Sequence, residues 1–199
     1  MDIINRVKNI LVAPKQEWVT IESERLPNVK VLTSYLLLLA LIPAIGQFIG
    51  QGLIGTTTLL GIKIGGISFG IKGAITSYIT MVGGAYLTAL VINLLAGSFG
   101  SEKNFDQAFS LVVYSYTPMC VAGVFYILPA LGILASLAGL YGLYILYVGL
   151  QPMMKTPTDK IVVYFIISLV CMVVVSLVLG AILAAIMAAI FLTSAMSIF

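Results

Sequence analysis

The sequence predicts an all-α membrane protein, built as a bundle of five transmembrane helices, on the strength of its composition, its charge spacing and its run lengths. Of its 199 residues, 61% are hydrophobic and mean hydropathy is +1.15, well above a soluble domain. The 31–62, 73–101, 107–154 and 161–199 runs contain no charged residue. A helix crosses the roughly 30 Å hydrocarbon layer in about 20 residues, so 107–154 holds two spans and each other run holds one.

Residues 1–30 form a short amphipathic segment ahead of the spans, at the cytoplasmic surface of the membrane. They contain half of the Lys and Arg residues. Asp2 can cap a helix whose apolar residues fall at helical spacing, and Pro14 suits the start of a second helix in which Trp18 is an interfacial anchor. These helices dock onto the bilayer or the bundle; partner binding is the alternative.

The first span, about 31–50, contains Pro43, which should bend it because proline lacks a donor N–H. Between this span and the next, apolar residues alternate with Gly, Ser and Lys on both sides of Gly65-Gly66. That pattern predicts a small β-hairpin over 60–71, in the first extracytoplasmic loop, turning at the two glycines. The alternative is a glycine-rich linker.

The remaining spans are expected at about 74–96, 107–127, 130–151 and 161–190, and together the five spans make one domain, 31–199. A tight turn near Pro129 makes the third and fourth spans an antiparallel pair. Small residues provide close helix packing in the last two spans: Gly132, Ala135, Gly139, Gly142, Gly180, Ala184 and Ala188. The final run exceeds a membrane thickness, so its helix either projects or tilts, or breaks near Gly180.

The distribution of Lys and Arg predicts the orientation. With the N-terminus in the cytoplasm, the cytoplasmic segments hold eight of the ten basic residues, and only Lys63 and Lys72 lie outside. The positive-inside rule favours this arrangement, which places the C-terminus on the extracytoplasmic side.

The sequence lacks the residues that catalysis by histidine, metal binding and proton-coupled transport usually require. The chain has no His, and its two cysteines, Cys120 and Cys171, lie inside apolar runs without metal-ligand spacing. No acidic residue lies inside a span, which disfavours proton-coupled transport. We therefore expect no catalytic residues, no metal, no cofactor and no nucleic-acid partner.

One polar and aromatic cluster lies within the third span: Tyr114, Tyr116, Thr117 and Pro118, with Asn93 as a polar neighbour in the second span. Pro118 cannot donate to the carbonyl of residue 114, so a hydroxyl or a water must replace that donor. The cluster is either a satisfied kink between helices or a small hydrated cavity for a ligand or lipid headgroup. Tyr147, near the cytoplasmic end of the fourth span, is expected as a second interfacial anchor.

Several segments resemble the Yip family, the Ypt-interacting proteins. They are Tyr-Ser-Tyr-Thr-Pro at 114–118, Leu-Pro at 128–129 and the Tyr- and Gly-rich run 139–150, which match its third and fourth spans. The opening at 6–11, with Pro14-Lys15 and Glu17-Trp18, is similar to prokaryotic members. The resemblance implies a five-span protein of a bacterial or archaeal cytoplasmic membrane.

Two functions are open, of which the family resemblance suggests the first and the kinked third span the second. The first is a non-enzymatic scaffold or membrane-organising, trafficking-type factor, whose partners are the lipid bilayer and other membrane proteins or further copies of itself. The second is a small-molecule channel or transporter that uses a polar cavity at the kinked third span. Eukaryotic relatives carry an acidic Leu-Tyr-Gly-Pro-type motif before the membrane, which residues 1–30 lack, so binding of a Rab-type GTPase is not carried over.

Overall fold

The computed structural model describes residues 2–57 and 63–196, and within this part five helical spans are long and apolar enough to cross a membrane. The predicted all-helical, five-span membrane architecture is therefore confirmed. The spans are Asn28–Ile54, Ile67–Phe99, Phe105–Ile127, Pro129–Met154 and Ile161–Leu183. Two helices precede them, α1 (Ile3–Val12) and α2 (Pro14–Glu24).

The first span is irregular and consists of α3 (Asn28–Val31), the π-helix η1 (Leu32–Leu36), α4 (Leu37–Leu39), α5 (Leu41–Gln47) and the π-helix η2 (Phe48–Ile54). The α-helix is interrupted at Ala40, three residues before Pro43, which cannot supply the next helical N–H. Beyond this break, a Cβ on Gly46 would lie 2.4 Å from the carbonyl oxygen of Gly123. Glycine is thus required where the first span crosses the third.

The second span is α6 (Ile67–Ala96) with the 3₁₀ turn η3 (Gly97–Phe99). The third divides into α7 (Phe105–Ser115), α8 (Thr117–Ala122) and the 3₁₀ segment η4 (Gly123–Ile127). The fourth comprises η5 (Pro129–Leu131) and α9 (Gly132–Met154). The third and fourth spans are neighbours in the bundle, since α7 and α8 both pack against α9.

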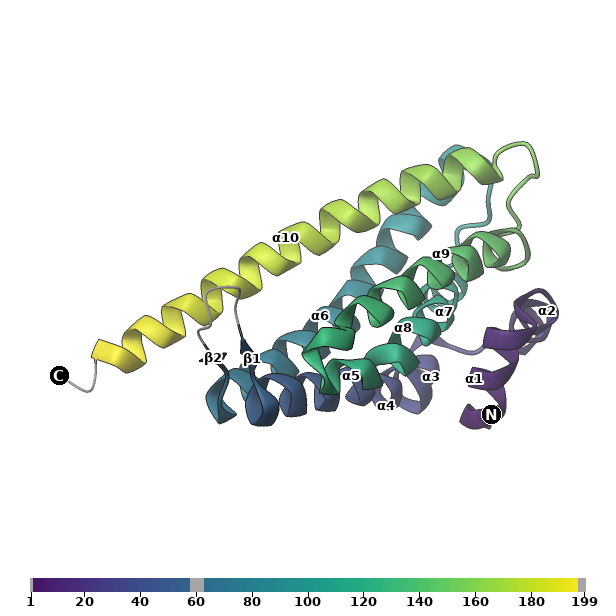
Figure 1. Ribbon diagram of the computed structural model, residues 1–199. Coiled ribbons are helices and arrows are strands. Elements are labelled where there is room, and N and C mark those ends of the chain that lie inside the picture. The colour runs from purple at the N-terminus through teal and green to yellow at the C-terminus, as the bar shows by residue number, and fades with distance from the viewer. Residues whose placement is uncertain (1, 58–62, 197–199) are drawn as a thin grey trace.

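The last span, α10 (Ile161–Met196), is a single helix that continues through Gly180 without a break. It packs mainly on α6 and projects past the bundle at the end opposite α1 and α2 (Figure 1). Of the outcomes open from the sequence, the break near Gly180 is therefore the one that does not occur.

The predicted hairpin at 60–71 is wrong, because residues from Ile67 onward belong to α6. The described strands are two residues long, β1 (Thr56–Thr57) and β2 (Lys63–Ile64), and pair antiparallel with Thr56 opposite Ile64. Residues 60–62 of the predicted first arm lie outside the described part. Gly66, at φ +128°, precedes the helix instead of forming a turn between strands. A helix satisfies its backbone groups internally, whereas a ribbon beside lipid leaves edges unpaired.

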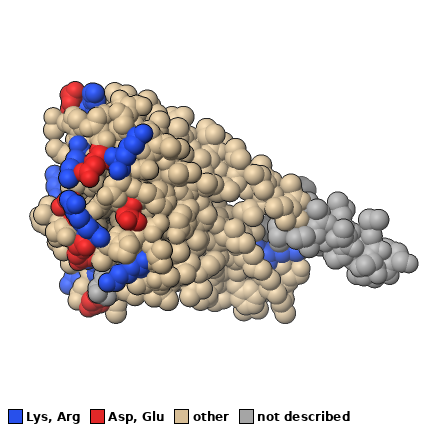
Figure 2. Space-filling model, turned by 180° about the vertical axis from the view of Figure 1, so that it is seen from behind, with Lys and Arg blue, Asp and Glu red and all other residues tan. Residues whose placement is uncertain are grey.

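Charged side chains gather at one end of the molecule (Figure 2). This is the end at which α1 and α2 lie, opposite the C-terminus (Figure 1). The bundle therefore has one charged end and a long apolar body.

Gly142 is the point at which the fourth span packs against the backbone of the third. A Cβ there would lie 2.6 Å from the carbonyl oxygen of Ser115 on α7, whereas a Cβ on Gly83 of α6 would meet nothing within 4 Å. We expect Gly142→Ala to lower the free energy of unfolding by about 1–3 kcal/mol through overpacking. Thermal unfolding in detergent measures this loss of stability, and Gly83→Ala is the matched control. Equal melting temperatures for the two variants would contradict this packing.

Candidate functional site

The third span is broken at Tyr116, between α7 and α8. Pro118 has no N–H for the carbonyl of Tyr114, but the Thr117 hydroxyl donates to that carbonyl oxygen at 2.7 Å. The Tyr35 hydroxyl of the first span lies 2.8 Å from the same Thr117 oxygen. Because the single hydroxyl hydrogen of Thr117 is already in the bond to the carbonyl, the Tyr35 hydroxyl is the donor in this second bond.

The ring of Tyr114 is the centre of an aromatic and charged cluster. It meets Tyr35 edge-on at 4.7 Å between ring centroids and Trp18 at 6.2 Å. The Arg6 guanidinium lies 5.7 Å from the same ring centroid. The N-terminal helices are thus packed directly onto the kinked third span.

Arg6 is buried and pairs with two carboxylates of α2, Glu17 and Glu24. Burial lowers the pKa of Arg6, but the hydrogen bond to Glu24 and the nearby negative charges outweigh that effect and raise it above its ordinary value. Arg6 therefore stays charged and holds α1 and α2 together.

Trp18 is fully buried, so it is not the lipid-facing interfacial anchor that the sequence suggested. Its indole Nε1 donates to the carbonyl oxygen of Ile145 at 3.1 Å, and its ring fills the space over Gly149. The Tyr141 hydroxyl donates to the carbonyl oxygen of Leu11 at 2.7 Å. Both contacts dock the N-terminal helices onto α9 of the bundle.

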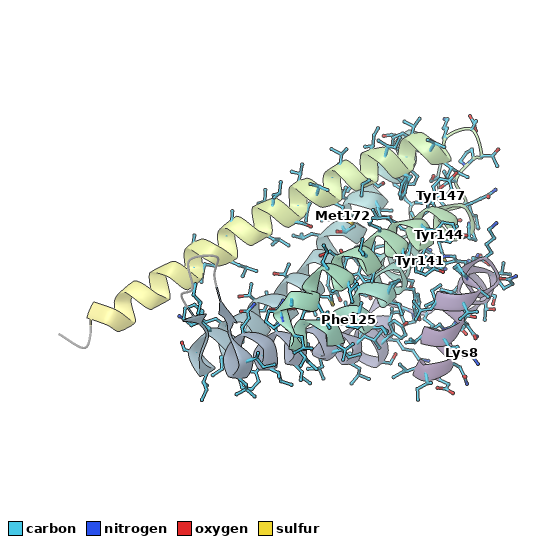
Figure 3. The ribbon with its side chains drawn as sticks, viewed as in Figure 1. Lys8, Phe125, Tyr141, Tyr144, Tyr147 and Met172 are labelled. Carbon is cyan, nitrogen blue, oxygen red and sulfur yellow. The ribbon has the colours of Figure 1, made fainter. Side chains whose placement is uncertain are left out.

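Tyr116, unlike Tyr114 and Thr117, lies on the wall of a cavity of about 890 Å³ between α6, α9 and α10. The cavity also reaches the first span at Gln47 and Gln51. Met172 lies on α10, which crosses over α6 and α9 (Figure 3), and lines the cavity from that side. The sequence left open a small hydrated cavity at this cluster, and Tyr116 is the member of the cluster that lines one. The sequence did not indicate the wall from α9 and α10, because that wall depends on how far α10 stands from α9.

The small residues of α9 and α10 differ in what they face. Ala135 is fully buried and Gly142 packs on α7, whereas a Cβ on Gly132 would lie 3.8 Å from the ring of Tyr126. Gly139 and Gly180 both line the cavity, and a Cβ at either would meet nothing within 4 Å. The side chains of Ala184 and Ala188 lie outside the described part.

The other candidate residues have separate surroundings. Asn93 is half-buried and its Oδ1 has no hydrogen-bond partner among the described residues. Tyr147 meets Phe165 of α10 edge-on at 5.3 Å, while Tyr141 and Tyr144 stack at 5.7 Å along α9 (Figure 3). No group of three or more His, Cys, Asp or Glu within the described residues could hold a metal ion.

Thr117→Val tests the two hydrogen bonds that the Thr117 hydroxyl makes at the break in the third span. It removes the donor to the Tyr114 carbonyl and the acceptor for Tyr35, and an unsatisfied buried polar group costs about 1–3 kcal/mol. We expect a lower melting temperature in detergent. Thr33→Val is the matched control, because Thr33 makes the same kind of bond to a backbone carbonyl at an exposed position; equal losses in both variants would contradict the role of the kink.

Arg6→Met tests the docking of the N-terminal helices. Removing one partner of a buried ion pair leaves uncompensated charge and costs about 3 kcal/mol. We expect hydrogen exchange to rise across 3–24 while the spans stay protected. Arg25→Met removes an exposed ion pair with Glu22 and should change the hydrogen exchange of this segment little. Unchanged exchange in Arg6→Met would show that the pair does not hold these helices.

Comparison with known protein families finds a match over most of the chain. The family model of the Yip1 domain matches residues 8–182, which include α2, the first four candidate spans and the fifth except its last residue, Leu183. Comparison with curated proteins finds no match. Comparison with solved structures likewise finds none.

Proposed function

The chain belongs to the Yip1 domain family, and from this premise we propose that it is a non-enzymatic scaffold that organises other membrane proteins. The scaffold acts in the cytoplasmic membrane of a bacterium or archaeon, as in the prokaryotic branch of the family. Its multi-pass membrane architecture supports the general assignment. The charged end of the bundle supports the scaffold role.

The observation that carries the proposal is the way in which α1 and α2 are held at the charged end. Trp18 and Arg6 are both buried, so the two helices are rigidly attached to the bundle. Lys8 and Lys15 remain exposed on them, and Figure 3 shows Lys8 on α1. A fixed, charged surface beside the membrane is suited to binding the polar parts of other membrane proteins.

The surface continues onto the neighbouring loop. Lys155 and Glu102 form an exposed ion pair with a 2.7 Å separation between nitrogen and oxygen. The hydrogen bond and charge of Lys155 lower the pKa of the Glu102 carboxyl, which favours its ionised form. By the positive-inside rule we assign this face, and with it the N-terminus, to the cytoplasm and the C-terminus to the outside.

The alternative is a small-molecule transporter, which the cavity beside Tyr116 favours. Transport requires a polar route across the membrane. Beyond Thr88, however, α6 turns Ala89, Ile92 and Ala96 into the core, where all three are fully buried. The scaffold is therefore the better-supported function.

Reversing the charges of Lys8 and Lys15 should change what the protein binds. We expect Lys8→Glu with Lys15→Glu to lose at least half of the membrane proteins cross-linked to the wild type in native membranes, because complementary charge guides such contacts. Quantitative mass spectrometry of the cross-linked material measures this loss. Ser68→Glu, at an exposed site on the opposite end of the bundle, is the control.

Two outcomes would contradict the scaffold. The first is that the charge-reversed variant retains every cross-linked partner of the wild type. The second is robust solute flux through purified protein in liposomes, lost on Tyr116→Phe at unchanged melting temperature, which would instead support the transporter.

A further inference from the structure

The cavity has two chemically different walls. The α6 wall carries Lys72, Thr76, Thr80 and Thr88, all of which line the cavity. The opposite wall comes from α9 and α10 and is mostly apolar, although it includes Ser136 and Ser176. Its residues include Leu140, Leu143, Leu146, Leu169, Met172, Val173 and Leu177. The molecule that fits between these walls is itself amphipathic.

The cavity is accessible from the lipid. Three of its apolar lining residues are also on the lateral surface: Leu140 is 63% exposed, Val173 50% and Leu177 68%. These residues lie on α9 and α10, so an acyl chain can enter between the two helices from the bilayer. The volume of about 890 Å³ is within the range of about 300–1,000 Å³ of ligand sites.

The polar end of the cavity is positively charged. Among the described residues that line it, Lys72 is the sole charged side chain. The Lys72 ammonium also lies 5.9 Å from the ring centroid of Phe69. Gln47 and Gln51, which are hydrogen-bonded to each other, line the same end. This group suits an anionic headgroup such as a phosphate.

The hydroxyls deeper in the cavity suit the next part of a phospholipid. Thr76 follows Lys72 by about one helical turn, some 6 Å along α6, and Thr80 follows by another. Ester carbonyls accept hydrogen bonds, and threonine hydroxyls donate them. At the inner end, the Tyr116 phenol neighbours the buried Thr88, and the core of the bundle closes the cavity beyond it.

We propose that this cavity binds one anionic phospholipid from the surrounding bilayer. The phosphate lies at Lys72, the ester groups lie against Thr76 and Thr80, and the acyl chains lie along α9 and α10. Gly139 and Gly180 leave the space for these chains. The proposal concerns the lateral face and the end away from α1 and α2, so it stands or falls separately from the scaffold.

The experiment compares lipid binding to purified full-length protein in mild detergent by native mass spectrometry. The probes are phosphatidylglycerol and phosphatidylcholine with identical acyl chains. We expect one phosphatidylglycerol per chain, bound more tightly than phosphatidylcholine. Lys72→Gln should reduce that preference about fivefold, the effect of one basic residue near anionic lipid. Lys8→Gln, at the opposite end, should leave it unchanged.

Filling the cavity tests where the lipid lies. Gly139→Leu and Gly180→Leu, separately and together, place side chains in open space and should block retention of either lipid at an unchanged melting temperature. Gly83→Leu is the matched control, because its Cβ also meets nothing within 4 Å but does not line the cavity. Equal affinity for both lipids, or full retention in the doubly filled protein, would overturn the proposal.

Discussion

The bundle depends on satisfying one backbone carbonyl where water is absent. Pro118 breaks the third span and deprives the Tyr114 carbonyl of its helical donor. Thr117 supplies the replacement proton, and Tyr35 of the first span in turn donates to Thr117. A local defect in one helix is thereby converted into a specific contact between two spans. The same break turns Tyr116 away from this contact and onto the wall of the cavity.

The ring of Tyr114 extends this arrangement to the N-terminal helices. Arg6 and Trp18 both pack on it, and Arg6 gathers the carboxylates of Glu17 and Glu24. Burying a charge is costly unless it is paired, so these helices have a strong preference for the docked position. The charged end is therefore a fixed surface of the bundle, the property on which the proposed scaffold role depends.

Glycine has opposite consequences at two positions on the same helix. At Gly142 the absence of a side chain lets α9 approach the backbone of α7, and at Gly139, three residues earlier, it leaves part of a cavity open. The difference lies in the neighbour: α7 is close to α9, whereas α10 diverges from it (Figure 1). A stripe of small residues thus provides both the packing contact and the space for a ligand.

The sequence alone determined the membrane class, the five spans and the clustering of charge, because hydropathy, run length and charge spacing are properties of the chain itself. It also identified the unsatisfied carbonyl at Tyr114, since the chemistry of proline is local. Only the tertiary structure decided whether residues 67–71 were strand or helix, since a short apolar alternation fits both. It alone decided that Trp18 is buried and that Tyr35 completes the kink, since these contacts join residues far apart in sequence. The cavity likewise follows from the angle between α9 and α10, which no local pattern encodes.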